Sequence, residues 1–139
     1  MAPSTRSGSA DRSDARGFTL LELITVMALV AILAAIALPQ YKVAITQAKE
    51  ATLREDLFRF RDVIDQYQAD KGKYPASLDA LVQDGYLRRV PEDPITKAVD
   101  WEMVYAEPDT DRPGEAPGVF DVRSSSTLVS LSGTPYNEW

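Results

Sequence analysis

The sequence predicts an α+β fold in which a long N-terminal helix packs on a small antiparallel β-sheet. Three observations support this prediction: an apolar run over residues 18–38, helical spacing of apolar residues that continues to Lys71, and short alternating segments between residues 101 and 132. Short strands cannot bury both of their faces, so we expect the apolar stripe of the helix to cover one face of the sheet. With 139 residues, the chain has room for one small domain.

The first 17 residues, MAPSTRSGSADRSDARG, differ in composition from everything after them. They are rich in serine, alanine, glycine and charge and show no helical or strand periodicity, so we expect a disordered leader. Three arginines against two aspartates give this segment a net charge of +1, and the remainder carries −7 of the total of −6. By the positive-inside rule, this asymmetry places the N-terminus in the cytoplasm and the body across the membrane.

The apolar run over residues 18–38 contains three polar residues, Thr19, Glu22 and Thr25. As an α-helix it would be about 31 Å long, which is enough to cross the hydrocarbon core of a membrane. Pro39 follows the run. Inside a helix, a proline removes a backbone hydrogen bond and predicts a bend or local melting, and the alternative is that it marks a helix end.

Helical spacing continues after this proline. One apolar stripe recurs at intervals of three and four residues: Leu53, Leu57, Phe60, Ile64 and Tyr67. We expect the helix to stop near Lys71, because Gly72 suits a left-handed C-terminal cap and Pro75 cannot continue a helix. Ser77 is expected to cap a short helix that ends near Gly85. Its inward side chains would be Leu78, Leu81 and Val82.

Three candidate strands follow. Residues 101–107, WEMVYAE, alternate in the manner of a half-buried strand, with one face made by Trp101, Met103 and Tyr105. Residues 119–124, VFDVRS, form the second candidate, with Phe120 and Val122 set against the charged residues Asp121 and Arg123. Residues 127–132, TLVSLS, are the third.

The residue inventory excludes most common enzyme chemistries. The chain has no cysteine and no histidine, which rules out disulfides, Cys/His zinc sites, cysteine nucleophiles and His-based triads. Two acid pairs, Glu92/Asp93 and Asp109/Asp111, lie beside prolines without a partner base, so we interpret them as solvated turn residues. We expect no enzyme, and the acidic body argues against nucleic acid as a partner. The alternative from another class is a membrane-anchored enzyme or binding domain that does not polymerise.

Glu22 is the one charged residue in the apolar run. A charge in lipid is costly, roughly 2.5–3.5 kcal/mol at a helix centre, and usually persists by pairing. One interpretation places Glu22 at the membrane boundary, within reach of headgroups and water. The other requires cleavage after Gly17. The new amine of Phe18 would then lie about 6 Å before Glu22 along the axis and could pair with it, either within the chain or between parallel helices, where the pair would set their register.

The segment over residues 16–41, RGFTLLELITVMALVAILAAIALPQY, resembles the N-terminal segment of type IV pilins and of type II secretion pseudopilins, together the type IV filament superfamily. The shared features are a glycine before a phenylalanine, threonine and leucine next, glutamate as the fifth residue after the glycine, about twenty apolar residues, and a proline near their end. The resemblance implies that a prepilin peptidase cuts between Gly17 and Phe18 and methylates the new amine. It further implies that Glu22 acts in processing and docks on that amine of the preceding subunit, and that Pro39 is where the helix bends or melts on assembly.

A second resemblance covers the body. Residues 62–94, DVIDQYQADKGKYPASLDALVQDGYLRRVPEDP, and the closing GVFDVRSSS…NEW are similar to the corresponding segments of major pseudopilins. Together the resemblances imply a pilin-like subunit that polymerises into the type II secretion pseudopilus and drives protein export, with a type IV pilin of an adhesion or motility pilus as the alternative. The implied domains are a cleaved leader over residues 1–17, a transmembrane and filament-core half-helix over residues 18–38, and a periplasmic or extracellular body over residues 39–139.

The resemblance also implies the partners and the location. The partners would be further copies of the chain, a prepilin peptidase, an inner-membrane assembly platform, minor pseudopilins, and the membrane before assembly. The chain would cross the inner membrane once, with its body in the periplasm, and would then enter a pseudopilus or a cell-surface filament.

Major pseudopilins commonly carry an acidic, glycine-rich loop after the second strand that binds calcium, whereas this chain has RSSSTLVSLSG over residues 123–133. Calcium takes several oxygen ligands including carboxylates, and serine hydroxyls are poor replacements. The nearest acids, Asp121 and Glu138, are equally well explained as surface charges. We expect no metal and no other cofactor, with calcium as the open alternative.

Overall fold

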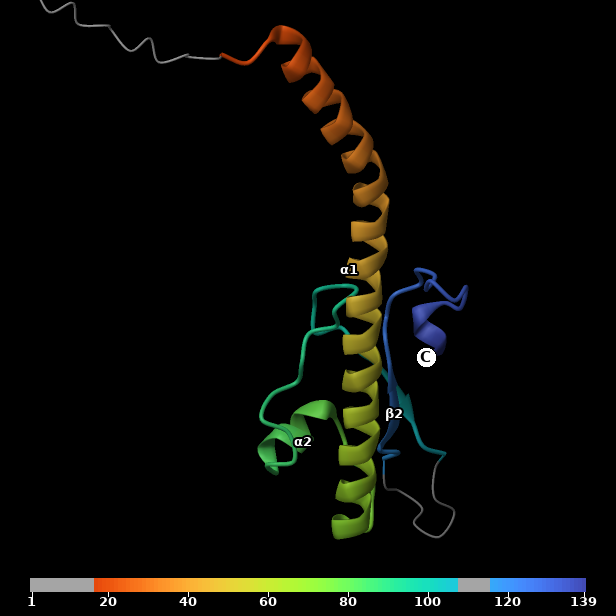
Figure 1. Ribbon diagram of the computed structural model, residues 1–139. Coiled ribbons are helices and arrows are strands. Elements are labelled where there is room, and N and C mark those ends of the chain that lie inside the picture. The colour runs from red at the N-terminus through yellow and green to blue at the C-terminus, as the bar shows by residue number, and fades with distance from the viewer. Residues whose placement is uncertain (1–16, 108–115) are drawn as a thin grey trace, which may run out of the picture. The chain divides into compact units, whose positions relative to one another are not determined.

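The computed structural model describes residues 17–107 and 116–139 (Figure 1). The chain divides into two compact units, residues 1–39 and residues 40–139, and helix α1, Leu20–Lys71, contributes to both. The leader predicted over residues 1–17 lies outside the described residues except for Gly17, as does the acid pair Asp109/Asp111. The elements after α1 are α2 (Leu78–Gln83), β1 (Glu102–Tyr105), β2 (Val119–Arg123) and the 3₁₀ turn η1 (Tyr136–Glu138).

Helix α1 has 52 residues and is helical without interruption through Pro39. A helix end or local melting at this proline is therefore wrong for the chain described here, and the bend stays a prediction. Proline costs one backbone hydrogen bond, but Ala35 and Ala37 beside it are among the strongest helix formers, so the flanking turns persist. The helix ends at Lys71 as predicted. Gly72 has a φ of 70°, and its N–H donates to the carbonyl of Gln68 at 2.8 Å.

In the first unit, every described side chain is exposed. The large apolar side chains between Leu20 and Leu38 are each 54–75% exposed, so this half of α1 has no protein core of its own. By length and composition, α1 is the one helix among the described residues that could cross a membrane. This agrees with the predicted transmembrane run, which places a continuous apolar surface where lipid or other helices can cover it.

The core of the second unit lies against the C-terminal half of α1. The predicted stripe is confirmed: Leu53, Leu57, Phe60, Ile64 and Tyr67 are all buried, and Val63 joins them. Ser77 caps α2 as predicted, accepting the N–H of Ala80 at 3.2 Å, and Leu78 and Leu81 point into the core. Figure 1 shows α2 and the strands next to this half of the helix, which is the predicted α+β arrangement.

The sheet has two antiparallel strands, β1 and β2, with Met103 opposite Val122. The predicted inward face of β2 was wrong for Phe120, which is 52% exposed, while Val119 and Val122 are buried. The cause is a bulge. Val104 pairs with Asp121 and Tyr105 pairs with Val119, which leaves Phe120 as the extra residue and reverses the alternation at this point.

Strand β1 also departs from the simple alternation. Trp101 is buried as predicted, but it precedes the strand, and Met103 and Tyr105 are exposed. The third strand, predicted over residues 127–132, is wrong. This segment forms a turn with a single bridge between Val129 and Pro135, because its N–H and carbonyl groups bond within the turn and to α1 rather than to β2.

Candidate functional site

The N-terminal end of α1 brings together three of the residues predicted to act in processing and assembly. Gly17, Phe18 and Glu22 all line one shallow hollow at this end, together with Thr19. Phe18 is 92% exposed, and Gly17 is exposed and stands outside the helix. Pro39, the fourth predicted residue, lies further along α1 and takes no part in this cluster.

Glu22 and Thr19 form a capping box. The Glu22 carboxylate accepts hydrogen bonds from the backbone N–H of Thr19 at 2.9 Å and from its hydroxyl at 3.2 Å. In return, the Thr19 hydroxyl accepts the N–H of Glu22 at 3.2 Å. This reciprocal pairing satisfies two N–H groups that have no partner in the helix, and it places a negative charge at the positive end of the helix dipole. The sequence analysis missed it, although the spacing T-x-x-E signals it.

The capping box turns the carboxylate of Glu22 toward the chain end. Thr19, which donates to it, directly follows Phe18, so the carboxylate is oriented toward the position where cleavage would create an amine. The pairing of Glu22 with that amine stays a prediction. In the uncleaved chain, the acid already has partners within its own first turn.

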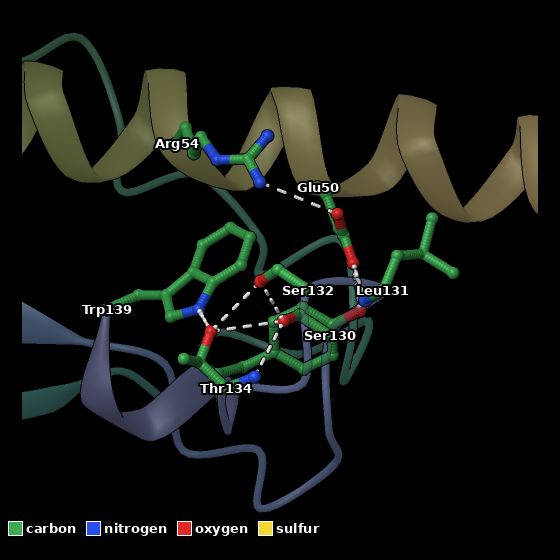
Figure 2. A network of polar contacts seen from close by, with 8 residues as sticks. Glu50, Arg54, Ser130, Leu131, Ser132, Thr134 and Trp139 are labelled. Carbon is green, nitrogen blue, oxygen red and sulfur yellow. Dashed lines mark hydrogen bonds and ion pairs between the residues drawn. The ribbon is translucent and has the colours of Figure 1, made fainter.

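A second polar cluster, which the sequence analysis missed, lies in the body (Figure 2). Glu50 on α1 is a buried carboxylate, 4% exposed, in line with the apolar stripe. It accepts the N–H of Leu131 at 2.7 Å and the hydroxyl of Tyr136 at 3.0 Å, and Arg54 lies 3.5 Å from its second oxygen. The signal that could have found it is position: Glu50 precedes Leu53 by three residues and so continues the stripe.

The two residues of the acid pair Glu92/Asp93 differ in burial. Glu92 is exposed, as a solvated turn residue should be, whereas Asp93 is fully buried, so that interpretation was wrong for Asp93. Asp93 accepts hydrogen bonds from the N–H of Ile95 at 2.7 Å and from the hydroxyl of Ser124. A buried carboxylate needs such donors, and here they join the proline-rich loop to the end of β2.

A groove and the acidic residues of the described body are the features that bear on ligand and metal binding. An open groove beside α1 has a lining that includes Asp56, Arg59, Phe60, Arg88 and Arg89. Partial burial raises the pKa of Asp56, and the charge of Arg59 offsets part of this rise. Within residues 17–107 and 116–139, no group of three or more acids stands close enough to hold a metal ion. Asp121 is not free either, because Arg61 donates to it at 2.8 Å.

Tyr136 gives a pH-dependent test of the cluster of Glu50, Arg54, Leu131 and Tyr136, named the Glu50 cluster below. Burial raises the pKa of its phenol, and the hydrogen bond to Glu50 acts in the same direction. Because the folded pKa is raised, this contribution to stability is complete below about pH 10 and is lost as the pH rises through the folded pKa. We expect Tyr136→Phe to make the loss of stability at alkaline pH shallower and to remove one late phase from the phenolate absorbance titration.

The control for this titration is Tyr86→Phe. A hydrogen bond to Asp70 raises the pKa of Tyr86 as well, but Tyr86 lies outside the Glu50 cluster. The Tyr86 variant should therefore lose a different phase and keep the one assigned to Tyr136. Identical titrations of the wild type and Tyr136→Phe would contradict the assignment.

An apolar helix with a capped acidic start, continued as the core helix of a small α+β body, defines a pilin-like filament subunit. Residues 12–38 match the family profile described as the prokaryotic N-terminal methylation motif. The chain is also similar to type II secretion system core protein G from several bacteria. Identity is 32% to that of Klebsiella michiganensis and 33% to that of Pseudomonas aeruginosa, in each case over 60% of this chain and 70% of the relative.

The similarity extends further in the Escherichia coli protein of the same name, which is 28% identical over 79% of this chain and 80% of its own length. The chain therefore belongs to the family of type II secretion system core protein G, the major pseudopilins, and is a pseudopilin subunit. No solved structure shows a significant match to it. The resemblance drawn from the N-terminal segment and from residues 62–94 is thus confirmed.

Proposed function

We propose that the chain matures by cleavage between Gly17 and Phe18, that the new amine of Phe18 is methylated, and that Glu22 docks on this amine in the preceding subunit. The observation that carries the proposal is the capping box inside the methylation motif. It orients the carboxylate toward the chain end before any cleavage, so a neighbouring amine needs only to replace or join the Thr19 donors. A pair of opposite charges removed from water together costs far less than either charge alone.

The apolar half of α1 is proposed to act twice. Its exposed side chains over residues 20–38 suit a lipid environment before assembly and suit contact with parallel helices afterwards. Alanines along this half, among them Ala28, Ala31 and Ala35, would let neighbouring helices approach closely. Pro39, which the helix tolerates here, is the proposed place of a change in helix geometry on assembly.

The filament is proposed to be the pseudopilus of a type II secretion system, with the acidic body in the periplasm and the apolar helix anchored in the inner membrane. The names of the relatives and the arginines before the apolar run support this. The partners would be further copies of the chain, a prepilin peptidase, an inner-membrane assembly platform and minor pseudopilins. The role is structural and not enzymatic, and no metal or organic cofactor is required.

The intact mass of the protein extracted from membranes tests the maturation. We expect the mass of residues 18–139 plus one methyl group. The N-terminus should still be open to chemical sequencing, because a methylated amine reacts whereas an acetylated one does not. The replacement Gly17→Val should leave the leader attached, because a side chain at this position obstructs the peptidase. A wild-type protein that still carries residues 1–17 would contradict the proposal.

A deletion strain distinguishes a pseudopilus from a surface pilus. Loss of export of a secreted enzyme without loss of long surface fibres supports the pseudopilus. Loss of fibres in sheared cell-surface material, with export intact, would instead identify the chain as a pilin of a surface pilus.

A further inference from the structure

Several side chains of α1 contact the C-terminal segment over residues 128–139: Arg61 donates to the backbone oxygen of Trp139 at 3.2 Å, and a buried carboxylate, Glu50, holds the interior of the segment. Glu50 reaches from α1 to the N–H of Leu131 at 2.7 Å (Figure 2). The same oxygen accepts the hydroxyl of Tyr136 at 3.0 Å, so it holds two separate points of the segment. A carboxylate that is only 4% exposed is costly to bury without such donors. These hydrogen bonds therefore fix the position of the segment against α1.

The family implies a calcium ion in this segment, and the residues present do not fit one. Residues 124–137 contain no aspartate and no glutamate, whereas calcium takes six to eight oxygen ligands that normally include carboxylates. The buried serine hydroxyls already bond to protein groups: Ser124 donates to Asp93, and Ser130 pairs with Thr134 at 3.1 Å. One buried amide oxygen in the described residues, Asn137 Oδ1, lacks a partner, and a single neutral oxygen does not make a divalent site.

The positive charge that an ion would supply is supplied by Arg54. Its guanidinium lies 3.5 Å from Glu50 and 4.4 Å from the centre of the Trp139 ring, over which it stacks (Figure 2). The indole N–H of Trp139 donates in turn to the hydroxyl of Thr134 at 3.0 Å. A cation placed near Glu50 would therefore face the guanidinium charge and the hydrogens of two donors, all of which repel it.

We propose that Glu50, with Arg54 and Trp139, replaces a bound calcium ion as the lock that holds the 128–139 segment against α1, so that this pseudopilin folds and stays folded without calcium. Glu50 joins α1 to Leu131 and Tyr136, which follow it by 81 and 86 positions in the sequence. A bound ion likewise connects ligands that are distant in the sequence. The proposal concerns the body alone and is independent of processing at Gly17.

Thermal unfolding of the full chain in detergent micelles, followed by circular dichroism, tests the calcium independence. We expect the same Tm in a chelator and in millimolar calcium. If the folded chain had a calcium site, a calcium concentration a hundred times the Kd would raise the Tm by several degrees, because binding to the folded state adds directly to stability. A rise of that size in the wild type would overturn the proposal.

Variants test the lock itself. Glu50→Gln keeps the size of the side chain but removes the charge, and we expect a lower Tm and faster proteolytic cleavage within residues 128–139, in chelator and calcium alike. Glu55→Gln is the matched control, since Glu55 lies on the same helix in an exposed ion pair with Arg59. Should Glu50→Gln fail to fold, Tyr136→Phe removes one donor only and should show the same cleavage to a smaller degree. Variants that melt and resist protease as the control does would refute the lock.

Discussion

Replacing Glu22 by glutamine is expected to leave membrane insertion intact and to abolish filaments. Insertion should not suffer, because the variant removes a charge that costs roughly 2.5–3.5 kcal/mol at the centre of a spanning helix and less near its end. Glutamine also keeps the capping box, since its amide oxygen can accept from Thr19 as the carboxylate does. What it loses is the charge that would pair with the amine of Phe18. We expect at least a tenfold loss of sheared filaments, measured by electron microscopy and immunoblotting.

Three companion variants separate the charge from the cap. Glu22→Ala removes both and should equal Glu22→Gln in filament loss. Thr19→Val removes the capping hydroxyl but keeps the backbone N–H donor and the acid, so it should cost the helix start about 1 kcal/mol and leave most filaments in place. Glu55→Gln, an exposed acid on the same helix, is the neutral control. Normal filaments from Glu22→Gln would show that Glu22 acts as a cap or an interfacial residue and sets no register.

The sequence predicts those parts of the fold that depend on periodicity or on local caps. The stripe from Leu53 to Tyr67 follows from spacing alone, and the helix end at Lys71 follows from the conformation that Gly72 can adopt. Both are decided by residues within a few positions of one another. The same is true of the Ser77 cap, which acts three residues away.

The sequence fails where contacts across the chain decide the outcome. The bulge at Phe120 depends on how β2 registers with β1, and nothing in the alternation of β2 alone reveals it. From the sequence, Asp93 is predicted to be a solvated loop residue, because its partner Ser124 lies 31 residues further along the chain. The position of Glu50 in the apolar stripe indicates that it faces the body, but its partners, Leu131 and Tyr136, lie too far along the sequence to be predicted.

The candidate site divides along the same line. Gly17, Phe18 and Glu22 are consecutive or nearly so, and their geometry is that of a single helix start, which a motif can specify. The Glu50 cluster joins α1 to residues 81 and 86 positions later and has no local signature apart from its place in the stripe. This is why the sequence predicts the geometry of the helix start but not the contacts that close the body.

Trp101→Ala is expected to destabilise the body by about 3–5 kcal/mol, because the indole fills the core between α1 and the sheet. Trp101 is 7% exposed and meets Phe60 edge-on with ring centres 5.0 Å apart. Its indole N–H donates to the carbonyl of Pro91 at 2.8 Å, so the variant also leaves that carbonyl without its donor. For a body of this size, each kcal/mol lowers the Tm by about 4–8 °C, and the fall should exceed 10 °C in a circular dichroism melt of the full chain in micelles.

Two further variants decide which part of Trp101 matters. Trp101→Phe keeps an aromatic ring beside Phe60 but loses the hydrogen bond to Pro91, so it should cost about 1–3 kcal/mol, less than the alanine variant. Phe58→Ala is the control, because Phe58 stands on the same helix and is 72% exposed, and its removal should change the Tm little. If Trp101→Ala melted with the control, the indole would belong to the surface and the core would close without it. Filaments would also be lost in Trp101→Ala only at temperatures above its lowered Tm, in contrast to Glu22→Gln, whose defect should persist at every temperature because its body remains folded.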